Sequence, residues 1–186
     1  MPTDLLILMP RRYYRRRTVV VRPKKKWGSN ITNFNLTTTG DTTAQVATTV
    51  LVQNAASSSN PTPVILKCGN FKLQGDAYYQ SGNSTSLIQL MLYVFYLPEG
   101  ATPETPAQYQ ALLTAHPEWI LAWKYVEGIS PTSAKTENLN TYSFSSRLKR
   151  NLNSGDRVVL VGMATASSAL TAAKFSGMCQ FWTCAN

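Results

Sequence analysis

The stretch SLIQLMLYVFYL, from Ser86 to Leu97, is the most apolar part of the sequence. It has hydrophobic residues at both odd and even positions, and the side chains of a strand point alternately to the two faces of a sheet. Both faces of such a strand must therefore be covered. The sequence predicts a central strand here, with the protein core on one face and another layer or subunit on the other.

Shorter runs of β-branched and aromatic residues lie on both sides of this strand, separated by turn-forming residues. Together they predict about eight strands, spaced as in sandwiches and barrels and without the βαβ rhythm of a parallel sheet. The predicted fold class is all-β, a single antiparallel jelly-roll sandwich. Gly69 indicates a bulge or a bend. The other predicted strands are Trp27–Thr39, Ala44–Gln53, Val64–Leu73, Trp119–Val126, Thr141–Leu148, Arg157–Ala164 and Ala172–Cys184.

One short helix is predicted in the segment TPETPAQYQALLTAHPEW. Thr105 and Gln108 have the spacing of a capping box, and Pro106 would occupy the first helical position, where its missing N–H costs nothing. Pro117 ends the run. The apolar face of the helix would be formed by Tyr109, Leu112, Leu113 and His116.

The stretch RRYYRRRTVVVRPKKK, from Arg11 to Lys26, carries most of the excess charge of the chain. Residues 1–26 hold nine Lys and Arg and one acidic residue, a net charge of +8; residues 27–186 hold nine and eight, a net charge of +1. The sequence therefore divides into a basic N-terminal arm, 1–26, and a nearly neutral folded domain, 27–186. The 44% hydrophobic content supports one domain with its own core.

Nucleic acid is the predicted partner of the arm. Lys and Arg side chains that neutralise phosphates release condensed counterions, which gives sequence-independent binding that weakens with salt. Tyrosines placed among arginines can stack on unpaired bases, at about 1–3 kcal/mol per base. Two alternatives stay open for the arm: a solvated tail that aids solubility, and a nuclear localisation signal. The candidate nucleic-acid-binding residues are Arg11, Arg12, Tyr13, Tyr14, Arg15, Arg16, Arg17, Arg22, Lys24, Lys25 and Lys26.

The sequence offers few residues for an enzymatic or metal site. The single histidine, His116, is expected on the apolar helix face, where a packed or capping role is favoured over that of a catalytic base. The acidic residues are scattered singly, without the cluster that a metal-dependent nuclease requires, and the sequence has no phosphate-binding glycine loop. We expect no catalytic activity, no metal and no cofactor.

Cysteine usage and apolar runs bear on the compartment of the protein. Cys68, Cys179 and Cys184 lack the spacing of a zinc site and are predicted to be buried free thiols in a reducing compartment. No apolar run reaches the roughly 18–20 residues of a membrane helix, so no membrane insertion is expected. The apolar piece near the start of the sequence is too short for a secretion signal.

A polybasic arm followed by a single Thr- and Asn-rich jelly roll resembles the capsid proteins of circovirus-like viruses, the circular Rep-encoding single-stranded DNA (CRESS-DNA) viruses. The stretches that carry the resemblance are MPRRYYRRRTVVVRPKKK, residues 9–26, and SSRLKRNLNSGDRVVLVG, from Ser145 to Gly162. In the second, a basic strand end leads through an NSGD turn into an apolar strand. The arm is shorter than in circoviruses proper, and an apolar stretch, Leu5 to Met9, precedes it.

This resemblance implies a viral coat protein that assembles with itself into a small icosahedral T=1 shell of about sixty subunits. The arms would point inward and package the single-stranded DNA genome. The resemblance also implies residence in the virion, assembly in the host cell nucleus, and contacts with a nuclear import receptor and a cell-surface receptor. Apolar surface at Ser86–Leu97 and at Trp119 and Trp123 would serve subunit contacts, unless the two tryptophans belong to the monomer core.

Two other classes of protein are considered. A monomeric or small-oligomer β-barrel that binds single-stranded nucleic acid would carry cations and aromatic residues on its strands. A lectin- or cupin-type jelly roll would leave the arm unexplained, and cupin metal chemistry needs several histidines. Electron micrographs that look for uniform closed particles separate these classes. The strand cations open to the barrel hypothesis are Lys67, Lys72, Arg147, Lys149, Arg150 and Arg157.

Overall fold

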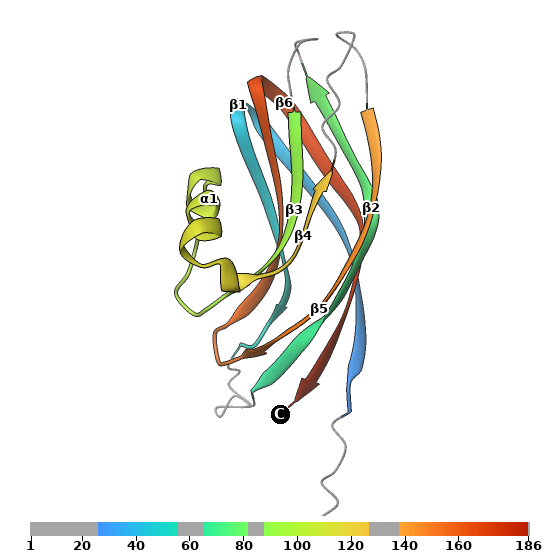
Figure 1. Ribbon diagram of the computed structural model, residues 1–186, viewed down its shortest axis with the longest axis vertical. Helices are drawn as coiled ribbons and strands as arrows, with labels where there is room; N and C mark the ends of the chain where they lie inside the picture. The colour runs from blue at the N-terminus through green and yellow to red at the C-terminus, as the bar shows by residue number, and fades with distance from the viewer. Residues whose placement is uncertain (1–25, 56–64, 82–87, 127–137, 186) are drawn as a thin grey trace, which may run out of the picture.

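The computed structural model describes residues 26–55, 65–81, 88–126 and 138–185, which form two packed β-sheets with one helix on the outside (Figure 1). Every strand pairing in this part of the chain is antiparallel. The predicted all-β class with one short helix is confirmed. The elements are β1 (Gly28–Gln53), β2 (Leu66–Ser81), β3 (Ile88–Leu97), α1 (Pro106–Ala115), the 3-10 helix η1 (Pro117–Trp119), β4 (Ile120–Val126), β5 (Asn138–Leu152) and β6 (Arg157–Ala185).

β1 and β6 are long strands that pair with each other and take part in both sheets. In the first sheet, residues 28–39 of β1 pair with residues 172–183 of β6, and β2 and β5 complete the order β1–β6–β2–β5 (sheet I). In the second, residues 44–53 pair with residues 157–165, and the order is β1–β6–β3–β4 (sheet II). Counted by sheet, these are eight strands in two antiparallel sheets, and the predicted jelly-roll sandwich is confirmed.

Two pairs of predicted strands are single strands in the structure. Trp27–Thr39 and Ala44–Gln53 fall within one element, β1 from Gly28, and Arg157–Ala164 and Ala172–Cys184 both belong to β6. The polar residues between them do not interrupt the strands, because β1 and β6 continue to pair on either side of the register shifts. Pairing with a neighbouring strand outweighs local turn propensity here.

β2 extends to Ser81, beyond its predicted end at Leu73. The extension contains Gly75, which lies opposite Gly177 of β6. A Cβ atom at Gly75 would lie 2.0 Å from the carbonyl oxygen of Ser176, so the two backbones approach too closely for a side chain. The same glycine that weakens the strand signal in the sequence is therefore required by the pairing with β6.

The hydrophobic core lies between the two sheets. Phe71, Leu73 and Phe175 face it from sheet I, and Leu90 and Leu92 face it from sheet II. All five side chains are completely or almost completely buried. Burial of a side chain of this size stabilises the fold by about 1.5–3 kcal/mol.

A buried hydrogen-bonded pair lies next to the point where β1 passes from one sheet to the other. The Thr38 hydroxyl donates to the side-chain oxygen of Gln45 over 2.6 Å and accepts from the backbone N–H of Ala173 over 3.0 Å. Buried polar groups without partners cost about 1–3 kcal/mol each. The hydrogen bond between Thr38 and Gln45 therefore favours the bend of β1 between these two residues.

A second apolar layer lies on the outer face of sheet II, beneath α1 (Figure 1). Tyr93, Phe95 and Leu97 of β3 belong to this layer, while the alternate positions 90, 92 and 94 belong to the core. The ring of Phe95 lies 5.7 Å from that of Tyr109 in α1, measured between centroids. The prediction of a central strand covered on both faces is confirmed, and the covering layer is the helix of the same chain.

α1 begins with the predicted capping box. The Gln108 N–H donates to Thr105 Oγ1 over 3.3 Å, and the Thr105 N–H donates to Gln108 Oε1 over 2.9 Å. Pro106 is the first residue of the helix, as expected. The N–H groups of Thr105 and Gln108, which have no backbone partner within the helix, are therefore satisfied by side chains.

His116 differs from its prediction as a member of the apolar helix face. The helix ends at Ala115, and His116 is the C-cap, whose N–H donates to the Leu112 carbonyl over 2.9 Å. The following Pro117 disfavours helical geometry at the residue before it. The imidazole, with 42% of its side chain exposed, stacks on Trp119 at a centroid distance of 4.0 Å. His116 thus caps the helix through its backbone N–H, and its ring packs on Trp119.

The turn between β5 and β6 is built around a buried carboxylate. Asp156, which is 3% exposed, accepts from the Tyr96 hydroxyl over 2.8 Å, from the Glu99 N–H over 3.1 Å and from the Asn153 N–H over 2.8 Å. Its own carbonyl accepts from the Asn54 N–H over 3.0 Å. Burial, together with this carboxylate, raises the pKa of Tyr96 to about 12. Asp156 therefore links the chain segments that follow β3 and β5 through its side chain, and the segment that follows β1 through its backbone.

The three cysteines are buried free thiols, as predicted. Burial raises the pKa of Cys68 to about 12, and burial followed by the nearby Cys68 does the same for Cys179. At neutral pH both thiols are therefore protonated and behave as small apolar side chains.

Candidate nucleic-acid interface

The predicted arm joins the folded domain at the edge of sheet I. Lys26 is exposed and is followed by Trp27 and by Gly28, the first residue of β1. Sheet I is therefore the part of the described structure next to the arm. The other candidate residues lie outside the described residues: Arg11, Arg12, Tyr13, Tyr14, Arg15, Arg16, Arg17, Arg22, Lys24 and Lys25.

The outer face of sheet I, turned away from the core, carries a group of cations. Directly opposed residues of neighbouring strands share one face of a sheet. Lys72 of β2 lies between Gln180 of β6 and Ser145 of β5, in one row across the outer face. Other rows of the same sheet add further Lys and Arg side chains. The exposed cations of this cationic face are Lys72, Arg147, Lys149 and Lys174.

Two of the strand cations proposed from the sequence point elsewhere. The Arg150 guanidinium donates to a main-chain carbonyl of η1 and lies 5.3 Å from the centre of the Tyr96 ring. Arg157 donates to the Ala101 carbonyl over 2.8 Å. Both side chains hold neighbouring segments of the fold together, and we assign them a structural role. Lys67 is half-buried at the start of β2.

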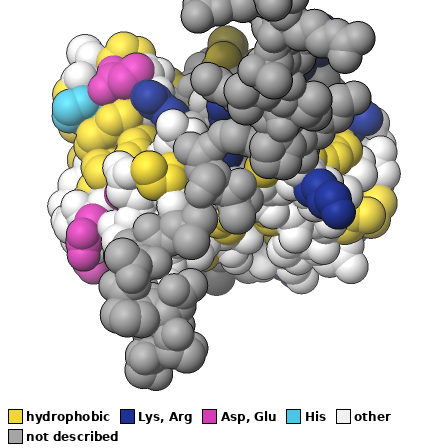
Figure 2. All heavy atoms as spheres, turned by 90° about the horizontal axis from the view of Figure 1, so that it is seen from below, with side chains coloured by type: hydrophobic (Ala, Val, Ile, Leu, Met, Phe, Trp, Pro, Cys, Tyr) yellow, Lys and Arg dark blue, Asp and Glu magenta, His cyan; other side chains and the backbone are white. Residues whose placement is uncertain are grey.

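The acidic side chains of the described residues lie mostly on the other side of the molecule. Glu99, Glu104 and Glu118 are exposed close to α1, and Asp156 is buried. In sheet I, the described acidic side chain is Asp76 of β2. Figure 2 shows acidic side chains at the left, the side on which α1 lies in Figure 1; no acidic side chain of the described residues is visible in the right half. By period two Asp76 shares the outer face with Lys72, so the described side chains of that face include more cations than acidic groups.

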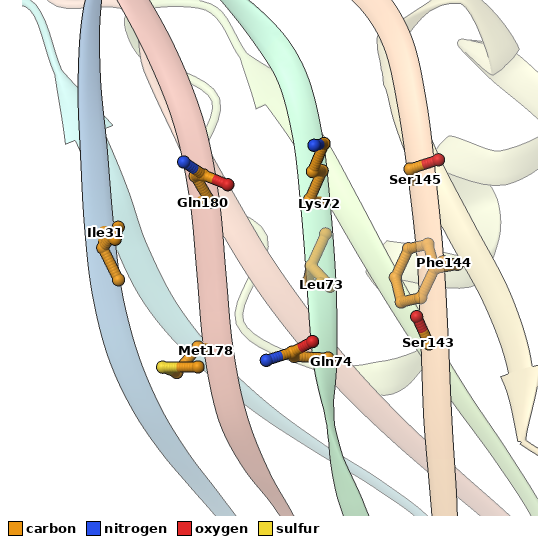
Figure 3. A pocket seen from close by; sticks show the side chains of 9 residues that line it. All are labelled: Ile31, Lys72, Leu73, Gln74, Ser143, Phe144, Ser145, Met178 and Gln180. Atoms are coloured by element: carbon orange, nitrogen blue, oxygen red, sulfur yellow. The ribbon is translucent and has the colours of Figure 1, made fainter.

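A groove of about 490 Å³ crosses the outer face of sheet I (Figure 3). Amides, hydroxyls and one ammonium group line it together with exposed apolar side chains, so it offers hydrogen-bond donors and acceptors as well as apolar contact. A smaller hollow of about 330 Å³ adjoins it at Lys72 and includes Arg147 and Trp182. The groove is lined by Ile31, Lys72, Leu73, Gln74, Ser143, Phe144, Ser145, Met178 and Gln180.

Two tryptophans of this region are not among the candidate residues above. Trp182 lies on β6 opposite Gly69, where the predicted bulge is confirmed by a register shift, and Trp27 precedes β1. The signal for Trp182 is the alternation in KFSGMCQFW, residues 174–182, in which Phe175, Cys179 and Phe181 are buried. By period two, Trp182 belongs to the opposite, outer face.

The single histidine pairs with a carboxylate at the end of α1. His116 Nδ1 lies 3.1 Å from Glu118 Oε1, and both side chains are largely exposed. The backbone amide of Glu118 itself, with His116, holds the pKa of this carboxyl below its ordinary value. Among the described residues, no group of three His, Cys, Asp or Glu could hold a metal ion. No helix in the described part of the chain is long and apolar enough to cross a membrane.

Exposed apolar side chains gather where β4 lies beside β5. Trp123 and Tyr125 of β4 are 61% and 42% exposed, and Leu148 of β5 is 56% exposed; we call these three residues the apolar edge. A hollow of about 420 Å³ between the two strands includes Trp123 and Leu148. Within the described residues β4 pairs with β3 alone and β5 with β2 alone, so each has an unpaired edge. Of the two tryptophans predicted for subunit contacts, Trp119 packs beside α1 and Trp123 is exposed.

Comparison with solved structures gives weak similarities. The chain is similar to a structure of infectious bursal disease virus, Gx strain (TM-score 0.34, 8% identity), covering 86% of this chain and 32% of that one. It is similar to a structure of the Gt strain of the same virus (TM-score 0.33, 8% identity), covering 84% of this chain and 32% of that one. It is also similar to a structure of Eiger TNF from S. frugiperda (TM-score 0.31, 8% identity), covering 81% of this chain and 91% of that one. The chain thus spans about a third of the two viral chains. No protein-family model and no curated protein matches the sequence. TM-scores below 0.5 do not establish a common fold, so the jelly roll is assigned from the strand order of this chain itself.

Proposed function

We propose that the protein is the capsid protein of a circovirus-like, circular single-stranded DNA virus. It assembles with itself into a closed icosahedral shell and packages single-stranded DNA through its N-terminal arm. The observation that carries this proposal is the division of charge, +8 on residues 1–26 and +1 on the jelly-roll domain 27–186. Domains that pack side by side need little net charge, whereas a packaged polyanion needs a cationic partner.

The apolar edge supports self-assembly. Trp123, Tyr125 and Leu148 expose large side chains beside two strand edges that have no partner among the described residues. Grouped apolar surface of this kind marks a protein interface more often than scattered exposed residues do. Closed point-group symmetry then gives about sixty copies in the smallest icosahedral shell.

The arms supply the DNA-binding charge of the shell. An arm of +8 repeated in every subunit forms a dense cationic lining that neutralises phosphates without reading bases. The same basic stretch serves as a nuclear import signal before assembly, and the assembled protein resides in the virion. The proposed role is structural, with no catalytic step, cofactor or metal.

Particle formation and nucleic-acid content test the proposal together. The purified full-length protein is expected to form uniform closed particles in electron micrographs, with an absorbance ratio that reports packaged nucleic acid. Deletion of residues 1–26 is expected to leave particles empty, and replacing Arg15, Arg16 and Arg17 by alanine gives a partial loss. Exchange of the exposed Lys124 of β4 for alanine is the charge control and leaves packaging unchanged. Sedimentation that shows only monomer at high concentration, across pH and salt, would overturn the proposal.

A second candidate function is favoured by the cationic face of sheet I. A monomeric or small-oligomer protein that binds single-stranded nucleic acid would use this face with the arm as an auxiliary tail. It would form no closed particles, and it would still bind after residues 1–26 are removed. The micrographs therefore decide between the two functions.

A further inference from the structure

We propose that the outer face of sheet I is itself a binding surface for single-stranded nucleic acid, distinct from the arm. Trp27 and Trp182 stack on unpaired bases, and Lys72, Arg147 and Lys149 contact phosphates. The inference rests on the proposed function only for the class of partner, a nucleic acid. It adds a second site, on the rigid part of the chain, and assigns its residues.

Each tryptophan of this face has an ammonium group over one side of its ring. Lys149 Nζ lies 5.0 Å from the centroid of the Trp27 ring, and Lys72 Nζ lies 5.6 Å from that of Trp182. A nucleotide presents a flat base and an anionic phosphate in one unit, so an indole next to an ammonium group matches both of its parts. Two such pairs on one face of the sheet can contact nucleotides of the same strand.

The fold leaves space beside Trp182. Its partner across the strands is Gly69, whose outer side is occupied by Lys149 and by the Leu148 carbonyl, so the free space lies on the other side of the indole, towards Lys72 and Arg147. A Cβ atom at Gly69 would lie 2.5 Å from Lys149 Cγ and 2.6 Å from the carbonyl oxygen of Leu148, so this position accepts only glycine. The adjoining hollow of about 330 Å³ includes Trp182, Lys72 and Arg147. A base can therefore reach the ring from the side where the cations lie.

The groove continues this surface across the sheet (Figure 3). Gln74 and Gln180 carry amides, and Ser143 and Ser145 carry hydroxyls, which donate to and accept from base edges of any sequence. Of the described residues that line the groove and its adjoining hollow, none is acidic. A row of neutral hydrogen-bonding groups between cations suits a polyanion with unpaired bases.

Charge complementarity selects the occupant. The arm of the same chain is cationic at +8 and would be repelled by this face. A second copy of the chain could offer Glu99, Glu104 and Glu118 but no flat anionic unit to fill the spaces beside the two indoles. A single-stranded nucleic acid satisfies both the charge and the aromatic rings.

Binding of the full-length chain to a fluorescently labelled oligothymidine, measured by anisotropy over a salt series, tests the proposal. Lys72→Gln and Arg147→Gln are each expected to reduce the log–log salt slope by about 0.7, the value for one phosphate contact on a single strand. Trp182→Leu is expected to lower the affinity about tenfold and leave the slope unchanged, because stacking releases no counterions. The matched control is Lys124→Gln, on β4 of sheet II, which changes neither quantity.

A second measurement does not depend on variants. Photo-crosslinking of the full-length chain to an oligonucleotide that contains bromouracil is expected to label the peptides with Trp182 or Trp27. Crosslinks confined to residues 1–25, or a Lys72→Gln slope equal to that of Lys124→Gln, overturn the inference. So does a Lys72→Gln variant that loses particle formation with unchanged affinity, because the face would then be a contact between copies. If normal particles form but the crosslinks are confined to residues 1–25, or the Lys72→Gln slope equals that of Lys124→Gln, this inference fails and the proposed function stands. If no particles form but the variants change binding as expected, the proposed function fails and this inference stands.

Discussion

Asp156→Ala removes one acceptor that three donors share. The carboxylate receives the Tyr96 hydroxyl at 2.8 Å, the Glu99 amide at 3.1 Å and the Asn153 amide at 2.8 Å, and its side chain is buried. A hydrogen bond to a charged group contributes about 1.5–3 kcal/mol when considered alone. The substitution leaves three donors without an acceptor, at about 1–3 kcal/mol each. These costs are not fully additive, so we expect a total loss of about 3–5 kcal/mol.

That cost is a substantial fraction of the stability of a domain, which is about 5–15 kcal/mol. Urea unfolding of the unassembled protein, followed by tryptophan fluorescence, measures it. With a slope of about 2–3 kcal/mol per molar urea, the midpoint of Asp156→Ala should fall by about 1–2 M. Tyr96→Phe removes one donor and should cost about 1 kcal/mol.

Glu104→Ala is the control, because this exposed carboxylate precedes the helix and should change the free energy of unfolding by less than about 0.5 kcal/mol. If Asp156→Ala is no more destabilising than Glu104→Ala, the turn does not depend on the buried carboxylate. The link between the segments that follow β1, β3 and β5 would then have to reside in backbone bonds such as that from Asn54 to Asp156.

Three further outcomes are expected. The free energy of unfolding should fall as the pH rises from about 9 towards 12. Burial raises the thiol pKa values of Cys68 and Cys179 from 9.0 to about 12, so the thiols of the unfolded chain lose their protons first. A pH series on Cys68→Ala should show a weaker fall. Gly75→Ala should destabilise the protein by about 1–3 kcal/mol or more, measured by urea unfolding, because its Cβ would collide with the Ser176 carbonyl; stability equal to that of the unchanged protein would contradict the close approach. Trp123→Lys should reduce particle formation in sedimentation and leave the unfolding midpoint nearly unchanged, and normal assembly of this variant would remove the apolar edge from the subunit contacts.

The parts of the fold that the sequence predicts well depend on local patterns. The two apolar faces of Ser86–Leu97 indicate a doubly covered strand, and β3 is covered by the core and by α1. The capping residues Thr105 and Gln108 mark the start of the helix to the residue. Each of these signals lies within one turn or one strand, so no knowledge of distant partners is needed.

The parts that sequence reasoning misses depend on pairing between distant segments. The continuity of β1 and β6 arises from their pairing with each other, and the second half of β2 depends on the fit of Gly75 against Gly177. The cationic face has the same origin, because Lys72, Arg147 and Lys174 come from three different strands. Counting charge along the sequence places the excess on the arm and leaves the domain nearly neutral. This count does not show that cations outnumber acidic side chains on the outer face of sheet I.

The central position of β6 in both sheets has a consequence for how the chain folds. In the described pairings β1 bonds only with β6, and β6 also joins β2 in one sheet and β3 in the other. Since β6 follows the other strands in sequence, neither sheet can close before its 29 residues have been synthesised. The first and last strands must find each other across almost the whole domain, and folds dominated by such distant contacts form in roughly milliseconds to seconds. Until then the apolar faces of β1 and β3 are exposed to water. The rate of folding, and the chaperones that act in this interval, therefore determine what fraction of the chains can associate.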